Sequence, residues 1–204
     1  MERIAALLLA AGRSERMGAF KPLLPFGGRT VIETCVVNLR EAGAAPIIAV
    51  IGHRAAELRA VLDPLGVITA LNHEAQSEMS VSIARGVELV PGEAGAVIIA
   101  LADQPAIPAT TIRRVMEAHG ANARLVVPEH GGRGGHPVLV DLSFREQLLH
   151  LDPQRGLRAL FAAHRDEVRR VPVDSPYIAR DMDTWQDYCA LHKEMFGVLP
   201  HIRD

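Results

Sequence analysis

The chain has 204 residues, of which 49% are hydrophobic and 23% are charged, and its formal net charge is −2. These values are ordinary for a globular domain, and the absence of a basic excess argues against a nucleic-acid partner. The apolar run near the start is too short to span a membrane, and no signal-peptide cleavage pattern follows it. We therefore expect one cytoplasmic domain that covers residues 1–204, with no membrane partner.

The first predicted element is a strand over residues 4–9, because an unbroken apolar run is typical of a strand buried in a parallel sheet. Three small residues follow it, and they allow backbone N–H groups to approach an anionic ligand closely. Cations suited to a triphosphate come next. The small residues are Ala10, Ala11 and Gly12, and the cations are Arg13, Arg16 and Lys21. The stretch therefore predicts a phosphate-binding loop.

Apolar runs and helical patterns alternate along the rest of the chain. We predict strands over residues 46–51, 67–71, 96–101, 125–127, 137–140 and 168–173. Helices are predicted over residues 30–41, 55–62, 80–89, 108–119, 143–149, 156–164 and 184–196. The glycine-rich residues 129–135 are predicted to be a connection. This alternation predicts an α/β fold, a single-domain Rossmann-like three-layer sandwich with a mostly parallel central sheet.

Two polar residues, Asn72 and Asp103, come just after predicted strands. Because ligands of such sheets bind at the carboxyl ends of the strands, we expect both residues to lie at the same edge as the phosphate-binding loop. The carboxylate of Asp103 suits Mg²⁺, which takes one or two carboxylates together with substrate phosphates. The spacing alone also allows Asp103 to cap a turn.

Residues 9–21 match a known family signature. They resemble the L-x-(A/G)-G-x-S-x-R-M-G-x-x-K loop of MobA-like nucleotidyltransferases, and their Ala-Ala-Gly form is similar to the MocA branch, the molybdenum cofactor cytidylyltransferases. The resemblance implies a nucleotide-diphospho-sugar-transferase-like fold and the transfer of CMP from CTP to molybdopterin cofactor, with release of pyrophosphate. It further implies that residues 9–13, which begin with Leu9, bind the nucleotide, with the backbone of residues 10–13 at the β- and γ-phosphates. Arg16 and Lys21 are implied to neutralise charge on the reacting phosphoryl groups.

Two acidic segments extend the resemblance. Asp103 begins a segment that resembles the family's D-x-P motif, in which the Asp binds magnesium. Asp183 matches the second metal-facing Asp, in a segment that resembles D-(I/V)-D-T-P-E-D, with Asp181 as a further candidate. Trp185 and Gln186 depart from that pattern, and Asp183 also stands where a helix N-cap is expected. The implied cofactor is Mg²⁺, with Mn²⁺ as an alternative.

Two further segments resemble family loops. Residues 72–86 resemble the N-x(5)-G-M-x-x-S loop around the base and ribose, with Glu78 in place of the Gly. Asn72, Ser80 and Ser82 are therefore candidate nucleotide contacts, although both serines also suit the start of a helix. Gly135 and His136 match a G-H-P-V segment beside the acceptor, where His136 is either a ligand contact or a turn residue.

The residues leave other functions open. A related nucleotidyltransferase would use GTP, or a sugar or polyol phosphate acceptor, because the fold does not define the acceptor. A non-catalytic carrier would deliver molybdopterin to a molybdenum hydroxylase, the possible recipient. The loop, the cations and the two carboxylates occur together, and this favours catalysis. A methyl group at Ala11 would crowd a purine, which favours CTP over GTP.

Overall fold

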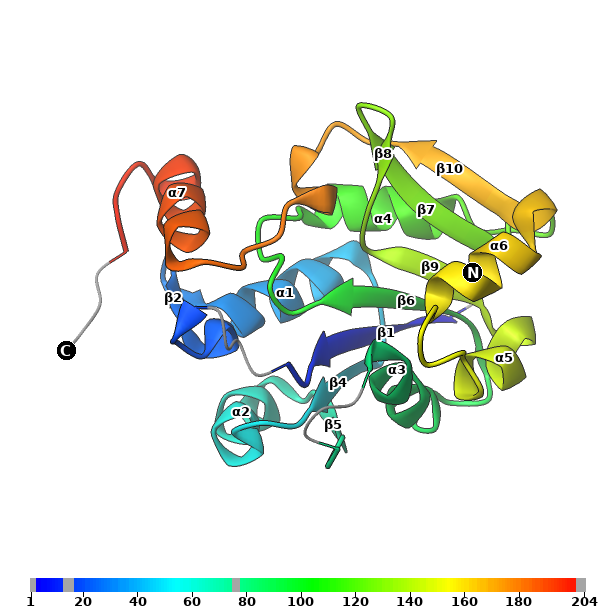
Figure 1. The fold of residues 1–204 in the computed structure, drawn as a ribbon, viewed down its shortest axis with the longest axis horizontal. Helices are drawn as coiled ribbons and strands as arrows, with labels where there is room; N and C mark the ends of the chain where they lie inside the picture. The colour runs from blue at the N-terminus through cyan, green and yellow to red at the C-terminus, as the bar shows by residue number, and fades with distance from the viewer. Residues whose placement is uncertain (1–2, 13–16, 75–77, 201–204) are drawn as a thin grey trace.

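The computed structural model describes residues 3–12, 17–74 and 78–200 (Figure 1). Its main strands are β1 Arg3–Ala10, β4 Ile47–Ile51, β5 Ile68–Leu71, β6 Ala94–Leu101, β7 Leu125–His130, β8 Arg133–Gly134, β9 Val138–Asp141 and β10 Val168–Pro172. The helices are α1 Val31–Ala42, α2 Ala55–Leu62, α3 Met79–Val87, α4 Ala109–Glu117, α5 Arg145–Leu149, α6 Leu157–Ala163 and α7 Trp185–Phe196. The predicted order of strands and helices is confirmed.

The strands form one mixed sheet in the order β10-β7-β9-β6-β1-β4-β5, with the short β8 paired to β7. Strands β6, β1, β4 and β5 are parallel to one another, and β7 is parallel to β10. Strand β9 runs antiparallel to both β6 and β7. The sheet is therefore mostly parallel, as predicted, and the carboxyl ends of β6, β1, β4 and β5 meet at one edge.

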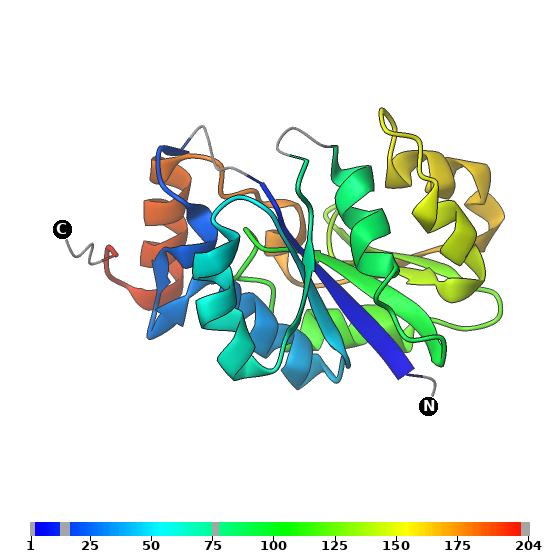
Figure 2. The same ribbon diagram turned by 90° about the horizontal axis from the view of Figure 1, so that it is seen from below.

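Helices cover both faces of the sheet, because successive side chains of a buried strand point to opposite sides. Along β1, Ala6 and Leu8 join one apolar cluster, whereas Ala5 and Leu7 join another. The first cluster includes Ile32 of α1, Leu58 of α2 and Ile112 of α4, and the second includes Ile83 of α3, Leu148 of α5 and Leu160 of α6. Figure 2 shows the helices on the two sides of the sheet. The predicted three-layer arrangement is confirmed.

Local capping sets where the helices begin and end. The Thr30 side chain accepts a hydrogen bond from the Glu33 N–H, the Glu33 side chain accepts one from the Thr30 N–H, and Gly43 ends α1 in a left-handed conformation. The same reciprocal cap joins Thr184 to Asp187 at the start of α7. Thr184 is therefore the N-cap of this helix, and the side chain of Asp183 is not needed for that purpose.

Two short hairpins differ from the predicted elements. The expected connection over residues 129–135 contains the turn between β7 and β8, in which Gly131 and Gly132 have positive φ values of 56° and 78°. Between β1 and α1, strands β2 Pro25–Phe26 and β3 Arg29–Thr30 pair in a separate sheet. Strands of two residues are too short to produce a sequence periodicity, so neither hairpin was predicted.

A third apolar cluster brings the C-terminal helix to this second hairpin. Tyr188 of α7 is buried with Phe26 of β2 and Met182, and its hydroxyl donates a 2.5 Å hydrogen bond to the Pro25 carbonyl oxygen. This packing places the segment before α7 beside the segment that precedes β2. Within residues 3–12, 17–74 and 78–200, every helix is too short or too polar to cross a lipid bilayer.

Candidate active site

The loops that follow β1, β4, β5 and β6 gather at one edge of the sheet. Gly52, after β4, packs so closely that an added Cβ would lie 3.0 Å from the Asn72 carbonyl oxygen and 3.3 Å from the Cβ of Ala11. Asp103 follows β6, the other parallel neighbour of β1. The structure therefore brings the first loop, Asn72 and Asp103 to the same edge, as the topology rule predicts.

Lys21 stands between two carboxylates from distant parts of the chain. Its Nζ lies 2.7 Å from Oδ1 of Asp183 and 3.5 Å from Oδ2 of Asp103. Lys21 is only 8% exposed, so these interactions are shielded from water. Lys21 begins a short 3₁₀ turn in the loop after β1, Asp103 follows β6, and Asp183 immediately precedes the cap of α7. Three of the predicted site residues therefore meet at one point.

The acidic groups outnumber the cations at this point in the described structure. Burial raises the pKa of the Asp103 carboxyl above its ordinary value, the negative charge of Asp181 raises it further, and Lys21 opposes both effects. Asp181 is itself held by Gln104, whose Nε2 donates to its Oδ1 over 3.5 Å. A further positive charge would therefore be stabilised here, because Lys21 pairs with both Asp103 and Asp183 and the charge of Asp181 acts on Asp103 as well.

The donor set fits a hard divalent cation. Asp103 and Asp183 each direct one oxygen at the same nitrogen of Lys21, so both oxygens are able to face a common ion. No cluster of three or more His, Cys, Asp or Glu side chains suited to a metal occurs among the described residues. Two carboxylates completed by phosphate oxygens and water are a typical Mg²⁺ environment.

The phosphate-binding loop is described only in part. Leu9 and Ala10 end β1, and Ala11 and Gly12 follow at the edge of the sheet. No described atom lies within 4 Å of a Cβ added at Gly12, so packing against the described residues does not explain the glycine. Two predicted phosphate contacts, Arg13 and Arg16, lie outside the described residues.

The three candidate nucleotide contacts after β5 differ in their hydrogen bonds. The Asn72 side chain is buried, donates to Oγ of Ser82 over 2.9 Å and accepts from the Glu74 N–H over 3.1 Å. Ser82 therefore orients Asn72. The Ser80 hydroxyl is buried and has no hydrogen-bond partner within the described chain. A buried polar group of this kind is costly unless a ligand or water satisfies it. Glu78 is the N-cap residue of α3 but makes no side-chain cap.

Gly135 and His136 lie beside the carboxylates. A Cβ added at Gly135 would lie 1.9 Å from the Ile178 carbonyl oxygen, so only glycine fits, and the next N–H, that of His136, donates to the same oxygen over 2.8 Å. Burial lowers the pKa of His136, whereas the Ile99 carbonyl and the charges of Asp103 and Asp181 oppose this effect. The two carboxylates therefore influence the pKa of His136, and burial favours its neutral form.

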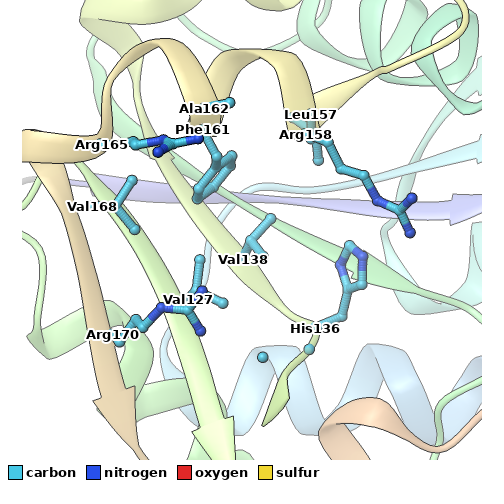
Figure 3. A pocket seen from close by; sticks show the side chains of 12 residues that line it. Val127, His136, Val138, Leu157, Arg158, Phe161, Ala162, Arg165, Val168 and Arg170 are labelled. Carbon is cyan, nitrogen blue, oxygen red and sulfur yellow. The ribbon is translucent and has the colours of Figure 1, made fainter. Parts of the chain in front are cut away.

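His136 also lines a pocket of about 800 Å³ between α6 and the strands β7, β9 and β10 (Figure 3). Its apolar wall consists of Val127, Val138, Leu157, Phe161, Ala162 and Val168. Three cations border it, Arg158, Arg165 and Arg170. Sequence reasoning missed these arginines. Arg158 lies in α6, whereas Arg165 begins the 3₁₀ turn that follows this helix, so no helical spacing relates the two.

An α/β fold with ligand-facing loops at this edge, and a lysine between two carboxylates there, are features of a nucleotidyltransferase-like protein. The chain belongs to the family of the MobA-like NTP transferase domain, whose model matches residues 6–168. It is 31% identical to nicotine blue oxidoreductase of Paenarthrobacter nicotinovorans, over 70% of this chain and 72% of that protein. It is 26% identical to molybdenum cofactor cytidylyltransferase of Escherichia coli, over 92% of this chain and 95% of that protein.

A solved structure supports the same family. Rv0371c from Mycobacterium tuberculosis has a TM-score of 0.84 and 29% identity, over 94% of this chain and 98% of that one. The same protein has also been solved in complex with manganese, with a TM-score of 0.77 to this chain. The bifunctional GlmU proteins match too, but the chain spans only about a quarter of their length, 27% for that of Geobacter sulfurreducens.

Proposed function

We propose that this chain transfers CMP from CTP to molybdopterin cofactor and releases pyrophosphate, forming the cytosine dinucleotide cofactor. The observation that carries the proposal is the position of Lys21 between Asp103 and Asp183 at the edge of the sheet. The Ala10-Ala11-Gly12 form of the loop and the cytidylyltransferase relative that matches 92% of the chain support the choice of CTP and molybdopterin.

Positioning and charge stabilisation are sufficient for this chemistry. The terminal phosphate oxygen of the acceptor forms a bond to the α-phosphorus of CTP, and the bond from that phosphorus to the leaving pyrophosphate breaks. Backbone N–H groups of residues 10–13 hold the β- and γ-phosphates. Lys21 turns from the carboxylates toward the phosphates and neutralises the charge that develops there, with Arg16 as a second cation.

Asp103 and Asp183 would hold Mg²⁺ or Mn²⁺, which supplies positive charge to the phosphate oxygens. Asn72, oriented by Ser82, faces the nucleotide, and so does the Ser80 hydroxyl, which has no hydrogen-bond partner among the described residues. Gly135 and His136 lie on the acceptor side, where a neutral imidazole donates or accepts a hydrogen bond without adding charge. A molybdenum hydroxylase is the proposed recipient of the product.

Family membership alone does not fix the reaction, since one relative is named an oxidoreductase and another a cytidylyltransferase. A sugar phosphate acceptor, GTP as the donor, and a carrier without chemistry are the competing functions. The carrier does not need Lys21 or Asp103, whereas the transferase requires both.

The test is the mass of the product formed from CTP and molybdopterin cofactor with Mg²⁺. The proposal predicts a cytidine-containing dinucleotide with the wild-type chain and with Lys193→Ala, which removes an exposed lysine of α7. It predicts a loss of product of about a hundredfold or more for Lys21→Ala and Asp103→Ala. If neither variant affects delivery of the pterin and no dinucleotide forms, the carrier function is correct instead.

A further inference from the structure

The pocket beneath α6 combines an apolar wall with three bordering arginines, Arg158, Arg165 and Arg170. Phe161 presents its ring to the pocket from α6, opposite Val127 and Val138 of the sheet (Figure 3). Arg158 and Arg165 make no side-chain hydrogen bond or ion pair within residues 3–12, 17–74 and 78–200. An aromatic ring between aliphatic walls favours a flat apolar ligand, and unpaired guanidinium groups favour an anion.

Arg170 differs from the other two arginines. Its Nη1 lies 2.9 Å from Oε2 of Glu129, so its charge is already balanced at the rim. The charge available to a ligand therefore comes from Arg158 and Arg165. Figure 3 shows Arg158 above His136 and Arg165 toward the opposite end of the pocket.

His136 connects the pocket with the carboxylate site. Its ring lines the pocket, and its Nδ1 lies 3.4 Å from the carbonyl oxygen of Ile99 on β6, the strand that leads into Asp103. A ligand in the pocket with an anionic group beside Arg158 and His136 would therefore place that group next to the site where the nucleotide reacts. The opposite end of the same ligand would face Arg165.

We propose that this pocket binds the acceptor and that Arg158 and Arg165 determine its class, a flat heteroaromatic ring that carries anionic groups. The inference rests on the proposed function for the identity of the reaction. The Phe161 ring and its valine neighbours hold the flat ring of the acceptor. Arg158 holds the attacking phosphate, and Arg165 holds a second anionic or strongly polar group. A sugar phosphate would leave the apolar wall without a matching surface.

The first test uses 6-carboxypterin, a fluorescent ring with one carboxylate, as an equilibrium probe. We expect saturable binding that Arg158→Gln weakens about tenfold, the usual effect of losing a charged hydrogen bond. Phe161→Leu is expected to weaken it severalfold. Arg155→Gln is the matched control, because Arg155 is exposed, lies just before α6 and does not line the pocket. Equal displacement of the probe by glucose 1-phosphate, or unchanged binding to Arg158→Gln, would overturn the inference.

The second test separates this inference from the proposed function. With CTP and molybdopterin cofactor, Arg158→Gln and Arg165→Gln should raise the KM for the acceptor about tenfold and leave the KM for CTP unchanged. Turnover with an unchanged acceptor KM in both variants would refute the role of the pocket as the acceptor site and leave the proposed transferase activity standing. Probe binding that depends on Arg158, without any nucleotide transfer, would support the role of the pocket in binding and refute the proposed transferase activity. Circular dichroism spectra that match the wild type confirm that each variant is folded.

Discussion

The ammonium nitrogen of Lys21 lies 2.7 Å from a carboxylate oxygen of Asp183, although 162 residues separate the two in the chain. The same nitrogen lies 3.5 Å from Asp103. A divalent cation bound by these carboxylates would occupy much of the space in which the ammonium group lies. Lys21 and the cation are therefore expected to compete for the same oxygens, and Lys21 becomes available to phosphate when the cation binds.

Replacement of Lys21 tests this competition directly. Lys21→Met removes the ammonium charge and leaves two neighbouring carboxylates, so we expect Mn²⁺ to bind about tenfold more tightly, or about 1.4 kcal/mol. Electron paramagnetic resonance of free Mn²⁺ measures the affinity without any turnover. Lys193→Met should bind like the wild type. An unchanged or weaker affinity in Lys21→Met would show that the two cations do not compete.

Asp103 is expected to make stability depend on pH. Burial raises the folded-state pKa of this carboxyl above the ordinary value of 3.8, so the folded chain keeps the proton at pH values where the unfolded chain has lost it. The free energy of unfolding therefore falls as the pH rises from the unfolded-state pKa of Asp103 through its folded-state pKa. Asp103→Asn removes this loss, and Lys21 keeps Asp183 as a partner.

Urea unfolding of Asp103→Asn and of the wild type checks this expectation. The variant should gain stability relative to the wild type well above pH 3.8, and the gain should shrink toward zero below it. Asp174→Asn, at an exposed position, serves as the control. A variant that is less stable at neutral pH would mean that the attraction of Lys21 for Asp103 outweighs the cost of burial.

Gly135 is expected to tolerate no side chain. Because a Cβ there would lie 1.9 Å from the Ile178 carbonyl oxygen, Gly135→Ala must move the backbone beside His136. We expect a loss of about 1–3 kcal/mol in the free energy of unfolding and a raised KM for the acceptor. Gly92→Ala, where no described atom lies within 4 Å of the added Cβ, should change neither quantity. Equal unfolding midpoints for the two variants would contradict the close approach.

Ala11 is expected to influence the choice of base. Its methyl group lies at the edge of the sheet, 3.3 Å from the position of a Cβ at Gly52, and it limits the room beside the loop. Ala11→Gly should raise the use of GTP relative to CTP by about tenfold. The ratio of kcat/KM for the two nucleotides measures the effect. An identical ratio in the variant and the wild type would show that Ala11 does not contribute to a preference for CTP.

Local signals were sufficient to predict most of the fold. The apolar run at 4–9 became β1, and the cap at Thr30 together with Gly43 bounded α1 as expected. The antiparallel direction of β9 was not predicted, because an apolar strand of four residues has the same pattern in either direction. The β2–β3 hairpin was missed for lack of length.

The candidate site was predicted less completely. Sequence rules placed the first loop and Asp103 at one edge, because both follow parallel strands. Only the family resemblance suggested that Asp183 faces the same site, since the contact depends on the packing of Tyr188 against the second hairpin. Arg158 and Arg165 were missed because the pocket forms from α6 and strands that are far apart in sequence. Contacts between distant elements leave no local pattern.

The most direct test of the proposed transferase is pyrophosphate release by the purified protein with Mg²⁺ and molybdopterin cofactor, compared in parallel for CTP, GTP, ATP and UTP. We predict rapid release with CTP, slower release with the other nucleotides, and none when the acceptor is omitted. A preference for another nucleotide would contradict the assignment of CTP. The absence of release with all four would contradict nucleotidyl transfer to this acceptor.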